Sequence, residues 1–490
     1  MIKLSTLTNK LPCCVFGDKN QIIRGISCHS QKTKTGYIFV ALNGFKTSGK
    51  KYIEDAIKNG ACVFVTDDQS TIKTLTKKYK KVTGVFTATP RQFLSEIANR
   101  FYDYPSNKLF LIGITGTDGK TTTSYMIKSI IEASGNKTGL IGTIKYFDGK
   151  KWLPAPNTTP DSLEFISFLA KLVKNKISYC ISEVSSHALA LGRVRGLNFQ
   201  VGIFTNLAQD HLDFHKTKKA YGQAKLKLFT NLSSDAYAVI NYDDPFSKTI
   251  IKNTRARKIL YSLSKQCDIL TKTINASPQK TEAIVYLKNH HPLKINLPML
   301  GNHNLYNMSA AIGTAQALKI PDKNIIKGLR KLPTVSGRLE RLANKRKINV
   351  FIDYAHTPLA LKTAIETLRP VTKGKLIVVF GCGGNRDKLK RPIMGRIAVE
   401  SADYVFITSD NPRNENPKTI IDDITKGINK KNYRIIIDRK QAIGNAIAMA
   451  QAGDTVLIAG KGHEQYQIIK NKTIHFCDKE TAKQCLSFSK

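Results

Sequence analysis

The pattern of apolar and polar positions predicts strands and helices that alternate along the whole chain. In the first part, apolar runs of strand length are separated by stretches in which apolar residues recur at helical spacing. The runs are Ile22–Ile26, Gly36–Leu42, Cys62–Thr66 and Val82–Thr87, and the helical stretches include 51–59 and 90–102. This alternation is typical of a small α/β domain, which we place at residues 1–106.

A second alternation predicts a mostly parallel sheet, because helices separate its successive strands. Its apolar runs are Leu109–Ile114, Tyr179–Val184, Val201–Asn206 and Ala236–Asn241, and we place this domain at residues 107–337. A third alternation, in residues 338–490, predicts a doubly wound, Rossmann-like domain. Its strands are Ile348–Asp353, Lys375–Phe380, Tyr404–Thr408, Tyr433–Ile437 and Thr455–Ala459, with helices at 359–368, 391–400, 418–428 and 440–451. The expected fold class is therefore α/β, in three domains.

A glycine-rich turn follows the first strand of the second domain. The segment Gly116–Thr121 reads Gly-Thr-Asp-Gly-Lys-Thr and opens a predicted helix. Backbone N–H groups in such a turn converge on phosphate oxygens, and the helix N-terminus adds its positive dipole. Lys120 would reach terminal phosphates, and the Thr121 hydroxyl would ligate Mg²⁺. A chance glycine turn is the alternative, because Ile114 stands where the first glycine of a full Walker loop belongs.

Polar residues gather where the predicted strands end. Glu183 closes one apolar run, Asn206 closes the next, and Asp210-His211 follow shortly after. Ligands of open α/β sheets bind at the carboxyl ends of the strands, so together these residues favour a Mg²⁺–nucleotide site, although each alone could cap a helix. In the third domain the loops Gly381–Asp387, Asp410–Arg413 and Gly460–Glu464 also follow strands, and we expect them at one edge of the sheet.

Composition changes this picture little. The 490 residues are 41% hydrophobic and 23% charged, which is ordinary for a globular protein. Nine cysteines without a CxxC pair, and an N-terminus without an apolar signal core, predict a reduced, cytoplasmic protein. The net charge of +41 suggests a nucleic-acid-dependent ATPase as one alternative. Because the lysines are spread over the whole chain, compositional bias of the genome is the favoured explanation.

Several separated motifs resemble one known family, the Mur ligases of bacterial peptidoglycan synthesis, and within it the branch that adds a diamino acid. They are Gly116–Thr122, Asn157–Pro160, Glu183–His187, Thr205–Asp213, Gly301–Asn307, Asp353–Pro358 and the three loops of the third domain. The resemblance implies a ligase that joins UDP-N-acetylmuramoyl-L-alanyl-D-glutamate to a diamino acid, with ATP, Mg²⁺ and an acyl-phosphate intermediate. Its three domains would bind the UDP group, ATP and the amino acid in that order.

We also expect a cytoplasmic monomer that binds neither membrane nor nucleic acid. A folylpolyglutamate synthase is a related alternative, since it is an amide ligase on a related fold. That enzyme lacks the UDP-binding first domain, so residues 1–106 argue against it.

The resemblance also implies roles for individual residues. ATP would contact Gly116, Thr117, Asp118, Gly119, Lys120, Thr121, Thr122, Asn304, Arg338 and Asp353. The UDP-muramoyl dipeptide would contact Ser30, Asn157, Thr158, Thr159, Ser185 and Arg193, and the diamino acid Arg386, Asp410, Asn411, Pro412, Arg413, Gly460 and Glu464. Lys120, His211 and Lys225 would be catalytic, while Thr121, Glu183 and Lys225 would hold Mg²⁺ and Asn206 would lie near the metal and phosphate.

Two of these expectations are specific. Lys225 would be carbamylated to N6-carboxylysine, which turns a cation into an oxygen ligand; a solvated lysine is the alternative. Arg413 would bind the distal carboxylate of meso-diaminopimelate and so discriminate against L-lysine; a helix cap or a pair with Glu415 is the alternative. The first domain departs from the family, since His29-Ser30-Gln31 replaces the usual Asp-Ser-Arg and Phe45 follows Gly44.

Overall fold

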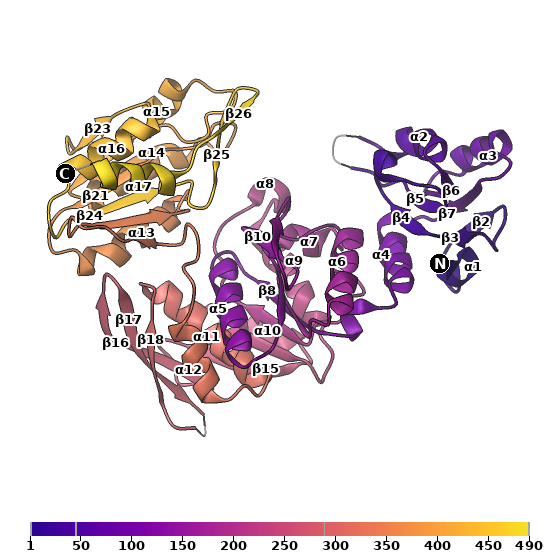
Figure 1. Ribbon diagram of the computed structural model, residues 1–490, viewed down its shortest axis with the longest axis horizontal. Helices are drawn as coiled ribbons and strands as arrows, with labels where there is room; N and C mark the ends of the chain where they lie inside the picture. Colours follow the sequence, from indigo (N-terminus) through magenta and orange to yellow (C-terminus); the bar gives the residue numbers. More distant parts are fainter. Residues whose placement is uncertain (1, 45–46, 289, 489–490) are drawn as a thin grey trace. The chain divides into compact units, whose positions relative to one another are not determined.

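The computed structural model describes residues 2–44, 47–288 and 290–488 (Figure 1). The chain divides into two compact units: 1–260 with 316–319, and 261–315 with 320–490. In the described ranges, no helix is long and apolar enough to cross a lipid bilayer.

The N-terminal part of the first unit is a five-stranded sheet covered on both faces, with strand order β2-β7-β6-β5-β4. The strands are β2 (Cys14–Phe16), β4 (Gly25–Ser27), β5 (Tyr37–Val40), β6 (Ala61–Thr66) and β7 (Thr83–Phe86); β1 (Ile2–Lys3) and β3 (Ile22–Ile23) form a separate pair. Alternate residues of β5 face opposite sides of the sheet and pack in two separate cores. Ile38 packs in the core that includes α1 (Leu4–Thr8) and α4 (Pro90–Phe101), whereas Phe39 packs in the core with α2 (Ile53–Lys58) and α3 (Gln69–Lys78). The predicted α/β character of this segment is confirmed.

The remainder of the first unit contains five parallel strands in the order β9-β12-β8-β13-β14, extended at one edge by antiparallel strands. They are β8 (Phe110–Thr115), β9 (Thr138–Ile141), β12 (Tyr179–Glu183), β13 (Val201–Phe204) and β14 (Tyr237–Asn241), with β10 (Lys145–Phe147) and β11 (Trp152–Pro154) at the edge. The helices are α5 (Lys120–Ala133), α6 (Ser162–Lys174), α7 (Ser186–Ala190), α8 (Leu212–His215), α9 (Lys218–Thr230) and α10 (Ser247–Asn253). The register pairs Glu183 with Ile114 and Phe204 with Thr115, so the carboxyl ends of β12, β8 and β13 are level.

The second unit begins with an antiparallel segment that the sequence pattern did not predict. Strands β16 (Ile269–Ser277), β17 (Lys280–Leu287) and β18 (Leu293–Leu297) form a meander, and the end of β15 (Arg257–Ser262) pairs with β16. Helices α11 (Asn302–Ala317) and α12 (Asp322–Arg330) follow. The expectation of a mostly parallel sheet therefore holds for the strands around the glycine turn but not for this meander.

The C-terminal part of the second unit is a six-stranded sheet with the order β19-β20-β24-β21-β22-β23. Its strands are β19 (Glu340–Leu342), β20 (Asn349–Asp353), β21 (Leu376–Phe380), β22 (Tyr404–Ile407), β23 (Tyr433–Ile435) and β24 (Thr455–Ala459). Alternate strand residues pack with α13 (Pro358–Leu368), α14 (Lys390–Ser401) and α15 (Pro417–Thr425) in one core, and with α16 (Arg439–Met449) and α17 (Asp478–Phe488) in the other. This confirms the doubly wound prediction. The hairpin β25 (Tyr466–Ile469) and β26 (Lys472–His475) was not predicted.

Candidate functional site

The glycine turn is fixed against the end of β13. Gly116 has φ +152°, and a Cβ at this position would overlap the Thr205 hydroxyl, so only glycine fits. Thr205 Oγ1 donates to the Asp118 carbonyl at 2.6 Å, and the Asp118 N–H donates to Asn206 Oδ1 at 2.9 Å. Asn206 therefore holds the loop as well as lying beside it, and these bonds fix the backbone of the loop just before α5 begins.

A buried carboxylate lies next to the start of α5. The Thr121 hydroxyl donates to Glu183 Oε2 at 2.9 Å, and the Thr143 N–H and hydroxyl donate to the same carboxylate at 2.9 Å each. The Lys120 ammonium donates to the Gly116 and Thr117 carbonyls at 2.9 and 2.7 Å. The structure thus brings Lys120, Thr121 and Glu183 to one end of the sheet.

These oxygen donors fit Mg²⁺ held mainly by a nucleotide. Mg²⁺ is usually bound by one or two carboxylates together with phosphates and water, and rarely by an all-protein cage. The part of the chain that the structure describes contains no group of three or more His, Cys, Asp or Glu side chains arranged for a metal ion. Glu183 with the Thr121 hydroxyl is a donor set of the expected size.

Lys225, on α9, lies against the glycine turn. Its side chain is 1% exposed, its Nζ donates to the Gly116 carbonyl at 2.7 Å, and it lies 4.3 Å from the centre of the Tyr221 ring. Burial, and then the charge of Lys120, hold the pKa of Lys225 well below its usual range. Because the side chain is buried, the alternative of a solvated lysine is wrong, whereas carbamylation of this amine stays a prediction.

Three histidines pack together after β12 and β13. The ring of His187 lies 4.8 Å from that of His211 and 5.4 Å from that of His215, and His215 Nε2 is 3.0 Å from Ser186 Oγ. Burial, followed by the two neighbouring imidazoles, lowers the pKa of His187 to about 4. His211 was predicted as a site residue. His187 lies in the motif Glu183–His187 but was assigned no role, and nothing in the sequence pattern indicated His215.

The residues assigned to the muramoyl dipeptide gather at the end of β12, apart from Ser30. Thr159 Oγ1 donates to the Glu183 carbonyl at 2.8 Å and accepts from the Ser185 N–H at 3.0 Å. Arg193 Nη1 donates to the Thr159 carbonyl at 3.0 Å. Two further members join the cluster through hydroxyl contacts: Thr158 with Thr143 at 3.1 Å, and the Asn157 carbonyl with the Tyr146 hydroxyl at 2.5 Å.

Ser30 belongs to the N-terminal sheet. It begins the short 3₁₀ helix Ser30–Lys32, and its carbonyl accepts from Asn59 Nδ2 at 3.0 Å. Phe45, the other departure from the family pattern, lies outside the described residues. The contact between Ser30 and a uridine group therefore stays a prediction.

The other residues assigned to ATP lie in the second unit. Asp353 ends β20 and accepts from the Leu339 N–H at 2.7 Å, and the Arg338 guanidinium lies 5.2 Å from the centre of the Tyr354 ring. Asn304 is buried, and its amide donates to the Leu300 carbonyl at 2.7 Å. This bond stabilises the start of α11. The contact of Asn304 with a nucleotide stays a prediction.

The three C-terminal loops meet at one edge of the sheet, as predicted. The Gly384 N–H donates to the Asn411 carbonyl at 2.9 Å, and Asn411 Nδ2 donates to Glu464 Oε2 at 2.9 Å. Gly460 has φ +116°, and a Cβ there would lie 2.8 Å from Asp410 Oδ2. The three loops are therefore closely packed, and a side chain at residue 460 would displace the Asp410 carboxylate.

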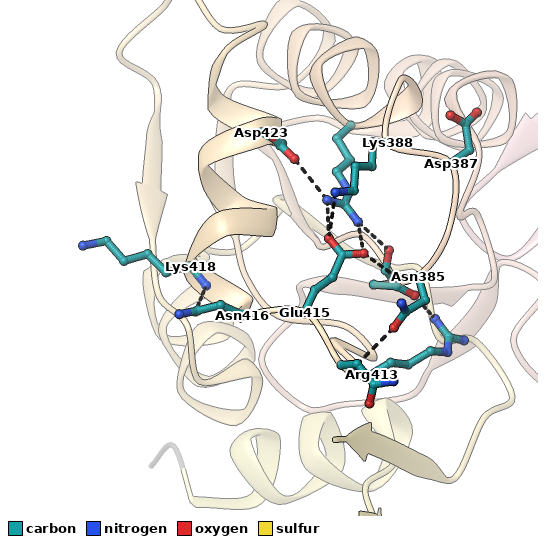
Figure 2. A network of polar contacts seen from close by, with 12 residues as sticks. Asn385, Asp387, Lys388, Arg413, Glu415, Asn416, Lys418 and Asp423 are labelled. Atoms are coloured by element: carbon teal, nitrogen blue, oxygen red, sulfur yellow. Dashed lines mark hydrogen bonds and ion pairs between the residues drawn. The ribbon is translucent and has the colours of Figure 1, made fainter. Parts of the chain in front are cut away.

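Among the described residues, Arg413 makes neither of the contacts that were its alternatives. Its Nη1 donates to the Gly384 carbonyl at 2.7 Å, which holds the guanidinium against the first loop. Glu415 instead accepts two hydrogen bonds from Arg391, at 2.9 and 3.0 Å (Figure 2). Arg386, from the first loop, is exposed. The guanidinium groups of Arg386 and Arg413 thus belong to adjacent loops.

Lys461 was not predicted as a site residue, although it lies inside the motif Gly460–Glu464. Its side chain is 0% exposed, and its ammonium donates to Asn411 Oδ1 and Glu464 Oε2 at 3.1 Å each. A buried ammonium in this position offsets the charge of the carboxylate and fixes its orientation. The motif Gly460–Glu464 was the available signal, but its spacing did not distinguish Lys461 from a surface lysine.

Comparison with known proteins gives a consistent result along the whole chain. Residues 22–102 match "Mur ligase family, catalytic domain", 114–315 match "Mur ligase middle domain" and 337–462 match "Mur ligase, glutamate ligase domain". The UDP-N-acetylmuramoyl-L-alanyl-D-glutamate–2,6-diaminopimelate ligase of Clostridium tetani is 43% identical over 488 residues, which cover 99% of each chain. A solved structure of a ligase with that name has a TM-score of 0.72 and 30% identity, again over 99% of both chains.

A folylpolyglutamate synthase is similar in fold alone. The enzyme of Mycobacterium tuberculosis, solved with ADP, is 18% identical, with a TM-score of 0.61. The similarity covers 90% of that enzyme but only 74% of this chain. The three-domain architecture is instead that of the full-length relatives.

Proposed function

The chain belongs to the Mur ligase family, and on that premise we propose how its residues divide the work of the reaction. It is an ATP-dependent ligase that adds 2,6-diaminopimelate to UDP-N-acetylmuramoyl-L-alanyl-D-glutamate in peptidoglycan synthesis. We propose domain boundaries at 106/107 and 337/338. We also propose that the enzyme is a monomer and that it works in the cytoplasm, where ATP is available.

The proposed reaction has two steps. An oxygen of the D-glutamate γ-carboxylate attacks the γ-phosphorus of ATP, the bond from that phosphorus to the bridging oxygen of ADP breaks, and an acyl phosphate forms. The amine of diaminopimelate then attacks the acyl carbon; it loses a proton, and inorganic phosphate leaves with the bonding electrons. Phosphoryl transfer requires mainly positioning and neutralisation of charge, which polar backbone and cationic groups supply.

The residues around the glycine turn are suited to the first step. The N–H groups at the start of α5 would bind phosphate oxygens, because those of Thr117 and Asp118 in the turn already donate to Asn206. Lys120 would move from its loop carbonyls to the terminal phosphates. Thr121, Glu183 and carbamylated Lys225 would hold Mg²⁺, which would add to the neutralisation of phosphate charge. The cluster of Thr159 and its neighbours would orient the acceptor peptide.

The proposal that the enzyme adds meso-diaminopimelate rests on one observation: two arginine guanidinium groups lie on adjacent loops. Arg386 would bind the carboxylate at the reacting end of meso-diaminopimelate, and Arg413 the distal carboxylate, because a planar fork matches a carboxylate in two hydrogen bonds. L-Lysine lacks the distal carboxylate and would leave Arg413 unpaired.

The third loop would complete this pocket. Glu464 pairs with Lys461 and is oriented by Asn411, so its carboxylate would take the distal amine. Asp410, Pro412 and Gly460 would shape the backbone around it, because Gly460 leaves room for the Asp410 carboxylate.

Steady-state kinetics test this function. We expect ADP release to require the UDP-muramoyl dipeptide and meso-diaminopimelate together, and to be much slower with L-lysine. Equal kcat/KM for the two amino acids would contradict the assigned pocket. Stimulation of ADP release by RNA or DNA, without the dipeptide, would favour the nucleic-acid-dependent ATPase that the charge of +41 suggests.

A further inference from the structure

A buried arginine connects the two loops that contain Arg386 and Arg413, the residues proposed to bind the carboxylates. Arg391, near the start of α14, is 0% exposed. Its Nη1 donates to Glu415 Oε2 at 2.9 Å and its Nη2 donates to Glu415 Oε1 at 3.0 Å, so the guanidinium and the carboxylate share two hydrogen bonds, which end at the labelled Glu415 in Figure 2. Asp423 on α15 accepts from the same Nη1 at 3.0 Å. Such a two-bond pair fixes orientation as well as charge.

Each member of this pair also binds the backbone of the first loop. The Asn385 N–H donates to Glu415 Oε1, and Arg391 Nη2 donates to the Gly383 carbonyl at 3.3 Å. Glu415 lies two residues after Arg413, and Asn385 directly precedes Arg386. The pair therefore joins the two loops at points next to the two proposed carboxylate binders.

The loop backbones at these points need such support. Asn385 and Arg413 both have φ +52°. Asparagine adopts this left-handed conformation fairly readily, but arginine rarely does so unless the surrounding contacts impose it. The Asn414 N–H donates to Asn385 Oδ1 at 3.1 Å, which adds a further link between the loops. Since the backbone at these positions directs the side chains of Arg386 and Arg413, a change in the link would shift one guanidinium relative to the other.

We propose that the Arg391–Glu415 pair is a specificity-determining device that sets the spacing between the Arg386 and Arg413 guanidinium groups. Neither member touches the amino acid; both are positioning residues. A substrate with two carboxylates needs both guanidinium groups at one fixed spacing, whereas a substrate with one carboxylate needs only one of them. The pair thus selects for diaminopimelate over lysine. This inference rests on the proposed function of the two arginines.

Two substitutions test the pair. Glu415→Gln keeps the shape of the side chain but removes its charge and one acceptor, and Arg391→Lys keeps the buried charge but removes the fork. We expect either change to raise the KM for diaminopimelate about 10- to 100-fold, because a displacement near 1 Å costs that much. The KM values for ATP and for the dipeptide should not change. Use of L-lysine should fall much less, so the selectivity between the two amino acids should fall.

Asp423→Asn is the matched control. Asp423 contacts the same Arg391 nitrogen, and Lys426 as well, but in the described ranges it has no hydrogen bond to either loop. This variant should therefore lose some thermal stability while it keeps the wild-type selectivity. Should Glu415→Gln fail to fold, Arg391→Lys decides the question, because it leaves the buried charge balance intact.

The outcomes separate the inference from the proposed function. If the wild-type enzyme does not use diaminopimelate, the proposed function is wrong. If the wild type prefers diaminopimelate but the variants lose activity equally with both amino acids, or if Asp423→Asn changes selectivity as much as they do, the pair is only structural and the inference is wrong. Unchanged selectivity in both variants would overturn it as well.

Discussion

Replacement of Lys225 with alanine should remove most of the ligase activity and make the remainder depend on added carboxylates. The wild-type amine is buried, lies 2.7 Å from the Gly116 carbonyl and has a pKa well below its usual range. A lysine with the ordinary pKa of about 10.4 is neutral in only about one molecule in 2,500 at pH 7, whereas this burial favours the neutral form. The neutral amine can add to CO₂ and release a proton, which gives the carbamate.

The size of the effect follows from the position of the side chain. Loss of the anionic oxygen ligand that we propose for Lys225 should reduce kcat about 10²- to 10³-fold, the range found when one preorganised electrostatic group is removed. Formate or acetate can enter the space that Lys225→Ala leaves and place a carboxylate there. Millimolar concentrations should therefore restore part of the activity, while chloride at the same ionic strength should not.

A second readout does not depend on catalysis. Without CO₂, Lys225 binds a proton more readily in the unfolded chain than in the folded chain, because its pKa is lower in the folded state. The free energy of unfolding should therefore rise with pH between the folded pKa and the unfolded pKa of about 10.4. The slope is at most about 1.4 kcal/mol per pH unit above the folded pKa. Lys225→Met, which is similar in length and uncharged, should lack this part of the slope. Bicarbonate should raise the Tm of the wild type at a mildly alkaline pH but not that of Lys225→Met.

Three results would contradict the proposed role of Lys225: activity of Lys225→Ala that no small carboxylate restores, electron density that ends at an unmodified amine in crystals grown with bicarbonate, or the same pH slope in wild type and Lys225→Met. Any of these would leave the buried amine as a structural donor to the glycine turn.

Three further predictions concern other residues. Lys120→Ala should abolish turnover and leave the far-UV circular dichroism unchanged; near-normal activity would contradict the assigned phosphate loop. Arg413→Ala should reduce kcat/KM for diaminopimelate roughly 30- to 1,000-fold, or about 2–4 kcal/mol, while use of lysine holds or rises; an equal loss with both amino acids would contradict its role. His187, whose pKa burial lowers to about 4, should destabilise the fold as pH falls from about 6.5 to about 4, because only the unfolded chain binds that proton readily. His187→Phe should reduce this acid-induced loss, measured as the free energy of unfolding against pH, by about 1–2 kcal/mol; an unchanged slope would show that another group is responsible.

The amino-acid sequence alone was enough to predict the parallel strands and the polar residues at their carboxyl ends. In β20, β21 and β24 the apolar runs are continuous because both faces are buried, and helices follow at regular intervals, so the doubly wound sheet could be predicted. The glycine turn and the polar strand ends could be predicted for a related reason: turn chemistry and ligand position are local consequences of a strand that leads into a helix. Lys120, Thr121 and Glu183 were found in this way.

Contacts between distant segments became known only from the folded chain. No periodicity showed that Lys225 is buried, that Thr205 and Asn206 hold the glycine turn, or that Glu415 pairs with Arg391, because register and packing bring these groups together across long stretches of chain. The β25–β26 hairpin was missed because both strands are short and β26 is exposed throughout. Residue types and local spacing determine which chemistry is available, whereas burial and register determine the charge state and orientation in which each group works.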